Sequence, residues 1–256
     1  LDLFTGYAQN DLPEFLLFII DTFHNALKRS VDMTITGSVA NDTDTLATKC
    51  YQMMIKMYSN EYSEILDLFY GIQVTKIYND DKTLSIVPEP YFILNLPIPT
   101  KTKNLQLIDC FKEYCVSDYL EGENAWYNEE TKKKENVNKK TIFWSLPKIL
   151  VIDLKRFKYN PITNNDSKIK VPIDLVLNDF NLCEYVEGYN RNEYIYDLYG
   201  VCNHSGGTLG GHYTANIKAK NGKWYLFNDT SISEVDFTGI NNSSGYCLFY
   251  RKKLNN

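Results

Sequence analysis

Apolar residues recur at helical spacing in the first part of the chain. Over 1–29 they return every three or four positions behind an N-cap at Asn10 or Asp11, a pattern that predicts a buried amphipathic helix. A polar stretch over 31–45 predicts a loop, and a second helical rhythm over 46–70 predicts one or two further helices. The apolar positions of the first helix are Phe15, Leu16, Ile19, Ile20, Phe23 and Leu27.

The hydrophobic period changes to two after Tyr70. Alternating apolar residues and turn signals over 71–99 predict strands, and 102–119 is expected to be helical. Further strands are expected at 125–127 and 139–144, on either side of a mixed charge run at 129–140. The nearly continuous apolar run Ile149–Leu154 is typical of a central strand buried on both faces. Together with the helical first part, this order predicts an α+β fold.

A β-hairpin is predicted for 212–228. Its two strands alternate apolar and polar residues on either side of an Asn-Gly turn. Counting from that turn places His212 beside Asn228 or Asp229, where a side-chain oxygen can accept the imidazole N–H and aim the other ring nitrogen at a reacting group. On the residues alone, a histidine that is merely satisfied by a polar neighbour is the alternative.

The composition indicates a globular protein and argues against some classes of partner. The chain has 256 residues, 44% of them hydrophobic and 23% charged, so it can bury a sizeable core as one large domain or two small ones. A net charge of -5 without a long basic run argues against a nucleic-acid or anionic-membrane partner. The six cysteines form no CxxC pair and no disulfide-scaffold spacing, which indicates reduced thiols in the cytoplasm or nucleus.

Four separated motifs carry a family resemblance. GGHYTA at Gly210–Ala215 and WYLFND at Trp224–Asp229 form a histidine box, LPKILVIDLKRF covers Leu146–Phe157, QNDLPEFLLFIIDTFH covers Gln9–His24, and YCLFYR at Tyr246–Arg251 ends the series. In their order along the chain, these motifs resemble those of the catalytic domain of the ubiquitin-specific proteases. The resemblance covers almost the whole chain.

The resemblance implies a papain-like cysteine peptidase fold with thumb, fingers and palm subdomains. One catalytic domain would then cover 1–256, with a helical thumb over about 1–70, fingers over 71–145 and a palm over 146–256. It also implies hydrolysis of the isopeptide bond after the C-terminal glycine of ubiquitin, or of a ubiquitin-like modifier. We expect no cofactor, because the implied chemistry belongs to a thiol and an imidazole.

The resemblance also assigns roles to residues. His212 would be the general base, Asn228 the orienting third member and Asp229 a supporting acid. Asp11 would contact the arginine-rich tail of ubiquitin. The full set of substrate-binding residues expected is Asp11, Glu14, Phe157, Gly210, Gly211 and Tyr213.

Two parts of the family pattern are missing from the sequence. The cysteine box that supplies the nucleophile is absent, so we expect the numbered chain to be inactive alone and the nucleophile to lie upstream of Leu1. Cys202 is a poor substitute because it precedes the glycine loop. The fingers positions that would hold zinc carry no cysteine, and we expect no zinc there. These positions are Asn79, Lys82, Asn128 and Thr131.

Two other functions stay open on the sequence. A pseudoenzyme could have kept the ubiquitin-binding cleft and lost the nucleophile, and an adaptor could use the fingers to hold another protein. A cysteine box upstream would favour the enzyme over the pseudoenzyme. The retained His212, Asn228 and Asp229 argue against the adaptor.

Overall fold

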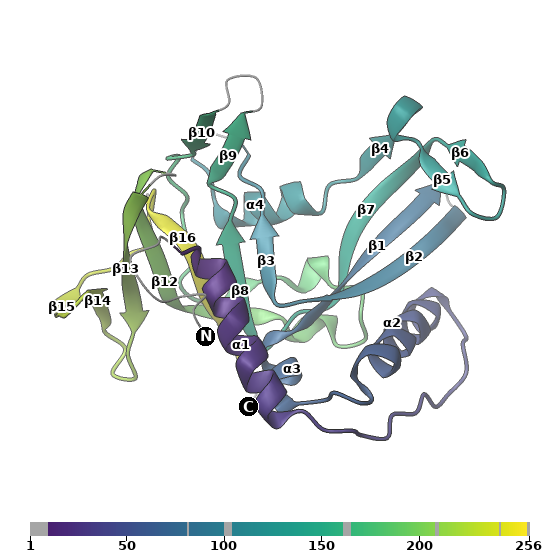
Figure 1. The fold of residues 1–256 in the computed structure, drawn as a ribbon, viewed down its shortest axis with the longest axis horizontal. Helices are drawn as coiled ribbons and strands as arrows, with labels where there is room; N and C mark the ends of the chain where they lie inside the picture. The colour runs from purple at the N-terminus through teal and green to yellow at the C-terminus, as the bar shows by residue number, and fades with distance from the viewer. Residues whose placement is uncertain are drawn as a thin grey trace.

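A computed structural model describes residues 10–80, 82–99, 104–160, 165–207, 210–240 and 242–254. Figure 1 shows three regions: helices α1 to α3, an arm of long strands ending in a small hairpin, and a large sheet on the other side of the molecule. Gln9 of the first motif, together with the rest of 1–9, lies outside the described residues.

The helices are α1 (Leu12–Leu27), α2 (Asp42–Tyr58) and α3 (Glu64–Phe69). Asp11 is the N-cap residue of α1, although its side chain makes no capping hydrogen bond. The expectation of a buried first helix is wrong. Only Ile20 of α1 is fully buried, because the helix lies on the outer face of the large sheet and touches it through one stripe (Figure 1). Its exposed large apolar residues are Phe15, Leu17, Phe23 and Leu27.

The arm is an antiparallel sheet in the order β2-β1-β7-β4, and α2 packs against its base. Its core joins residues of α2, β1 and β7, with Cys50 completely buried among them. The hairpin β5–β6 forms a separate two-stranded sheet at the far end. The bounds are β1 (Gly71–Asn79), β2 (Lys82–Tyr91), β4 (Asp118–Leu120), β5 (Trp126–Asn128), β6 (Lys133–Glu135) and β7 (Val137–Ser145).

The large sheet has eight strands, seven of them in the order β15-β14-β13-β12-β16-β8-β3, with β11 paired to β12. Its bounds are β3 (Ile93–Leu96), β8 (Ile149–Leu154), β11 (Phe180–Asn181), β12 (Ile195–Gly207), β13 (Gly210–Lys218), β14 (Trp224–Asn228), β15 (Ser231–Val235) and β16 (Gly245–Lys252). A separate hairpin joins β9 (Phe157–Asn160) to β10 (Asn165–Lys168), and short 3-10 turns cover Gly122–Asn124, Cys183–Tyr185 and Arg191–Glu193.

One part of the expected fingers segment lies elsewhere. Strand β3 and helix α4 (Leu107–Tyr114) fall within 71–145, yet β3 pairs in parallel with β8 of the large sheet, and α4 packs on the core beneath it. The expected boundary therefore fails for these two elements. Burial explains the difference, because Leu94 and Phe111 are almost completely buried in the palm core and would be exposed on a thin arm.

Strand β8 confirms the central strand expected from its apolar run. It lies between β16 and β3, and all its residues from Leu150 to Leu154 are buried. The run includes one carboxylate, Asp153, which is only 9% exposed. Within the described residues, no helix has both the length and the apolar character needed to cross a membrane.

Candidate active site

The hairpin β13–β14 brings the expected base and its partner together. Its register pairs Ala215 with Phe227 and Lys218 with Trp224, so Asn228 ends β14 near the start of β13. There, His212 Nε2 lies 2.6 Å from Asn228 Oδ1. The neighbourhood expected from the turn count is therefore present in the structure.

This hydrogen bond fixes the roles of the two ring nitrogens. The amide oxygen of Asn228 can only accept, so Nε2 of the neutral imidazole carries the proton and Nδ1 keeps a lone pair. The side chain of His212 is 48% exposed, and no hydrogen bond joins Nδ1 to another described residue. The arrangement can accept a proton from an approaching acid.

Asp229 is a more distant neighbour. Its Oδ2 lies 4.0 Å from His212 Nε2, and its side chain is 78% exposed. Its φ of 50° lies in the left-handed region, which Asp tolerates better than most residues. Because water screens exposed charges at this distance, Asp229 can give the imidazolium only weak support.

The glycines expected to line the groove lie at the end of the β12–β13 ladder. Gly206 and Gly207 pair with Gly211 and Gly210. A side chain at Gly211 would collide with the imidazole of His204 and with the carbonyl of Ser205, so only glycine fits there. One side of the Gly211 backbone therefore lies directly against His204 and Ser205, whereas the residue itself is exposed.

Three of the expected substrate-binding residues converge on Tyr246. The Tyr246 hydroxyl donates to Asp11 Oδ2 at 3.3 Å, and the Tyr246 ring lies 5.6 Å from Phe157 and 6.3 Å from Tyr213 between ring centroids. Tyr213 is 38% exposed, which leaves part of its ring available to a ligand. Glu14 lies further along α1 and is also exposed.

Sequence reasoning missed three residues of this region. Tyr246 was included only in a closing strand, His204 was given no role, and Asp153 was counted within an apolar run. The one available signal was Asp153, because a carboxylate inside a run typical of a central strand is unusual. Tyr246 and His204 carried no local signal, since their neighbours come from distant parts of the chain.

Asp153 is buried with one of its two carboxylate oxygens unsatisfied within the part of the chain that the structure describes. Its Oδ1 has no hydrogen-bond partner among the described residues. Burial first, and then the charge of Asp11, raise the pKa of Asp153 to about 7. A substantial share of the Asp153 carboxyl is therefore protonated near neutral pH.

None of the six cysteines is hydrogen-bonded to the expected base within the described residues. All six are free, and burial raises the pKa of Cys202 to about 11. Cys202 pairs with Ala215 in the ladder, whereas His212 pairs with Ser205. No hydrogen bond links a described cysteine to His212. The structure therefore gives no support to Cys202 as a substitute for the missing nucleophile.

The fingers hairpin carries hydrogen bonds at two of the four positions considered for zinc. Asn128 donates to Glu135 at 3.0 Å and accepts from the backbone N–H of Glu130 at 2.9 Å, and Thr131 also donates to Glu135. Among the described residues, no group of three or more His, Cys, Asp or Glu side chains could hold a metal ion. The absence of zinc stays a prediction.

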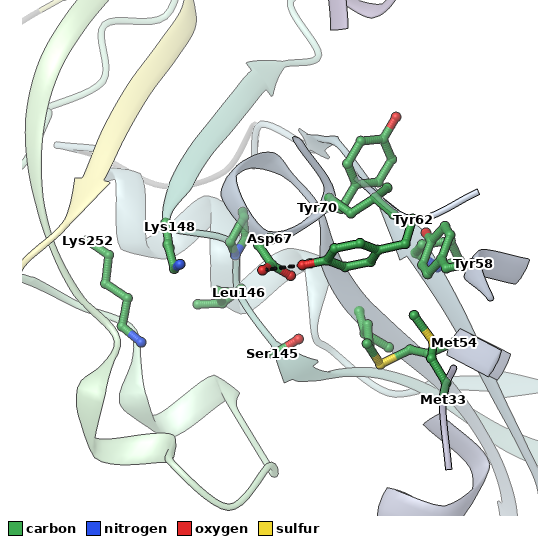
Figure 2. A pocket seen from close by; sticks show the side chains of 15 residues that line it. Met33, Met54, Tyr58, Tyr62, Asp67, Tyr70, Ser145, Leu146, Lys148 and Lys252 are labelled. Atoms are coloured by element: carbon green, nitrogen blue, oxygen red, sulfur yellow. Dashed lines mark hydrogen bonds between the residues drawn. The ribbon is translucent and has the colours of Figure 1, made fainter. Parts of the chain in front are cut away.

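A partly open pocket of about 230 Å³ lies away from His212, where α2, α3, the base of the arm and the palm meet. Figure 2 shows Met33, Met54 and Tyr58 on one side and Lys148 and Lys252 on the other. None of the described residues lining it belongs to the expected site. A larger and more open hollow of about 520 Å³ does lie beside the expected site, where His204, Ser205 and Gly206 are among its lining residues.

A base held by an amide on a strand hairpin defines a site suited to a cysteine peptidase, and the comparisons agree. The family model described as ubiquitin carboxyl-terminal hydrolase matches residues 2–250. This chain belongs to the ubiquitin carboxyl-terminal hydrolase family.

Curated relatives and solved structures are consistent with that membership. Ubiquitin carboxyl-terminal hydrolase 2 of Bos taurus is 34% identical over 250 residues, covering 96% of this chain and 41% of the relative. Ubiquitin carboxyl-terminal hydrolase 10 of Arabidopsis thaliana is 37% identical over 174 residues, covering 68% of this chain and 19% of the relative. The chain thus spans about two fifths of the first relative.

The fold is similar to that of one chain in solved structures of a deubiquitinating module. The SAGA Ubp8/Sgf11/Sus1/Sgf73 DUB module bound to ubiquitin aldehyde matches with a TM-score of 0.73 and 23% identity, covering 98% of this chain and 51% of that chain. The module bound to monoubiquitin matches with a TM-score of 0.74 and 22% identity, covering 98% and 50%. The expected papain-like α+β fold is confirmed.

Proposed function

We propose that the protein containing this chain is a cysteine-type deubiquitinase that hydrolyses the isopeptide bond after the C-terminal glycine of ubiquitin. Family membership supports the reaction class. The observation that carries the proposal is the 2.6 Å hydrogen bond between His212 Nε2 and Asn228 Oδ1, which leaves Nδ1 as a base.

The reaction needs one base, one thiol and one water molecule. His212 Nδ1 accepts the thiol proton, and the thiolate attacks the carbonyl carbon of the terminal glycine. Collapse of the tetrahedral intermediate breaks the C–N bond, and the imidazolium returns its proton to the leaving lysine amine. Water then hydrolyses the thioester, with His212 again acting as the base. Throughout, Asn228 holds the ring orientation by accepting from Nε2.

The thiol is expected on a segment upstream of Leu1, as the family resemblance implies. The raised pKa of Cys202 argues against this residue as the nucleophile, because a buried thiol remains protonated at neutral pH. The free cysteines support the expected cytoplasmic or nuclear location, since disulfides are rare in those reducing compartments.

The residues around Tyr246 form the proposed contact with the substrate tail. Asp11 offers a carboxylate to a cationic side chain, while Phe157 and Tyr213 offer aromatic surface beside it. The accessible backbone of Gly210 and Gly211 carries no side chain of its own, which suits close approach by a substrate whose last residues are glycines. An arginine-bearing tail that ends in glycine fits this chemistry.

The test uses ubiquitin with a thiol-reactive group at its C-terminus. We expect the full-length protein to form a covalent adduct, the present chain to form none, and His212→Ala in the full-length protein to reduce the labelling rate by about 1000-fold. His24→Ala is the matched control, because His24 hydrogen-bonds to Ser63 between α1 and the start of α3, outside the proposed site.

Three results would contradict parts of the proposal. Binding of ubiquitin without labelling by the full-length protein would establish the pseudoenzyme instead. Labelling that His212→Ala leaves unchanged would remove His212 from the role of base. An adduct formed by the present chain would show that one of its own cysteines is the nucleophile.

A further inference from the structure

His204 lies beside the proposed catalytic pair and takes no part in the mechanism above. It belongs to β12 and is only 5% exposed. Three aromatic rings surround it, those of Tyr213 at 4.8 Å, Phe157 at 5.5 Å and Tyr246 at 6.2 Å between ring centroids. A buried imidazole costs free energy unless its polar atoms are satisfied, so its partners are informative.

Lys168 of β10 determines which ring nitrogen of His204 carries the proton. Its Nζ lies 2.9 Å from His204 Nδ1 and also donates to the His204 carbonyl. An ammonium group can only donate, so Nδ1 must accept, and the neutral ring carries its proton on Nε2. Burial and the Lys168 charge hold the pKa of His204 below its ordinary value, while Asp11 opposes them. His204 is therefore a neutral histidine with a fixed tautomer.

The other edge of the ring lies against the backbone that carries His212. A side chain added to Gly211 would collide with His204 Nε2, which shows how close this edge lies to Gly211. Ser205 pairs with His212 in the ladder, and its hydroxyl donates to the His212 carbonyl at 3.2 Å. On its far side, the His204 backbone N–H donates to the Ser244 carbonyl at 2.9 Å.

We propose that His204 is a positioning residue for His212: held by Lys168, its imidazole supports the Gly211 backbone and thereby fixes the hydrogen bond from His212 to Asn228. This inference rests on the proposed function, because it gives His204 a role in catalysis through the base. The effect is large because displacing a catalytic group by about 1 Å can cost roughly 100-fold in rate.

Substitutions at Lys168 separate positioning from packing. Lys168→Met keeps an unbranched apolar stem but cannot donate to Nδ1, whereas Lys168→Gln keeps an N–H donor. His204→Phe keeps a flat ring and removes both nitrogens. Lys170→Met is the control, because Lys170 is an exposed lysine on the same segment.

The first readout is the imidazole NMR spectrum of His212 in the present chain, where ring nitrogen shifts report the tautomer and proton exchange reports the bond to Asn228. We expect Lys168→Met and His204→Phe to mix the tautomers and to speed exchange of the Nε2 proton about tenfold. Lys168→Gln should restore the parent spectrum, and Lys170→Met should not change it. In the full-length protein, kcat should fall about 10- to 100-fold with KM almost unchanged.

An unchanged His212 spectrum in folded Lys168→Met would overturn the proposal and leave His204 as a packing residue. Should His204→Phe fail to fold, the comparison of Lys168→Met with Lys168→Gln still decides. The NMR readout needs no ubiquitin. Altered His212 signals in a protein that never reacts with the ubiquitin probe would thus support the positioning contact while the proposed function fails.

Discussion

Two hairpins at opposite ends of the molecule each place an asparagine in a polar network, and they differ in what the network leaves unused. In β5–β6, Asn128 is 8% exposed, and its amide nitrogen and oxygen both bond within the hairpin. In β13–β14, Asn228 is exposed and bonds to His212, whose Nδ1 faces no described partner. The first network is closed and stabilises a turn. The second is open and can exchange a proton with a substrate.

The comparison teaches how to recognise a functional polar residue. A closed network contributes to stability because all its groups are satisfied. An open network contributes little to stability and keeps its capacity for chemistry. Asp153 belongs to neither kind, because it is buried like Asn128 and its Oδ1 has no described partner.

The largest effect is expected from Asp153→Asn. Because the pKa of Asp153 is higher in the folded protein than in the unfolded chain, ionisation of its carboxyl destabilises the folded state. This loss of stability grows as pH rises from about 4 to about 7. The variant should therefore be more stable than the parent by on the order of 2–4 kcal/mol at pH 8. Urea denaturation from mildly acidic pH to pH 8 measures this gain, with the exposed Asp118→Asn as control. A gain that does not depend on pH would contradict the assignment.

The open network is tested by Asn228→Ala. Loss of the acceptor for Nε2 should lower kcat of the full-length protein on a fluorogenic ubiquitin amide by about 100-fold. The free energy of unfolding should change by less than about 0.5 kcal/mol, because the residue is exposed. Asn228→Asp keeps an acceptor and should retain most of the activity. A stability loss in proportion to the activity loss would mean that this network is structural after all.

The closed network should give the opposite result. Asn128→Ala removes one of the two side-chain donors to Glu135 and leaves the N–H of Glu130 without its acceptor, which should cost about 2 kcal/mol of unfolding free energy. Activity per folded molecule should stay at the parent level. Glu129→Ala on the same turn is the control, because its exposed ion pair with Lys132 is worth less than about 1 kcal/mol. Equal losses in the two variants would count against a closed network.

The smallest effect is expected from Asp229→Asn. Asparagine tolerates the left-handed backbone conformation of this position, so the substitution removes only the charge. At 4.0 Å and with high exposure, that charge should be worth about two- to threefold in kcat at low salt and less at high salt. Rates measured at two ionic strengths test this. A loss as large as that of Asn228→Ala would make Asp229 the principal orienting group.

Local patterns in the sequence determined the elements and the centre of the site. The hydrophobic period indicated the helices near the N-terminus and the buried strand at 149–154, and the Asn-Gly turn placed His212 beside Asn228 or Asp229. These features are predictable because helix period, strand period and turn geometry depend on residues close together in the chain. The family resemblance then supplied the reaction class.

Only the tertiary structure decided which distant residues meet. It placed β3 beside β8, left one side of α1 exposed, brought Asp11, Phe157 and Tyr213 to Tyr246, and set His204 under Gly211. No local period encodes such contacts, because each depends on how whole strands and helices pack. The sequence thus determined the base and its partner, whereas the packing of the chain decided what holds them in place.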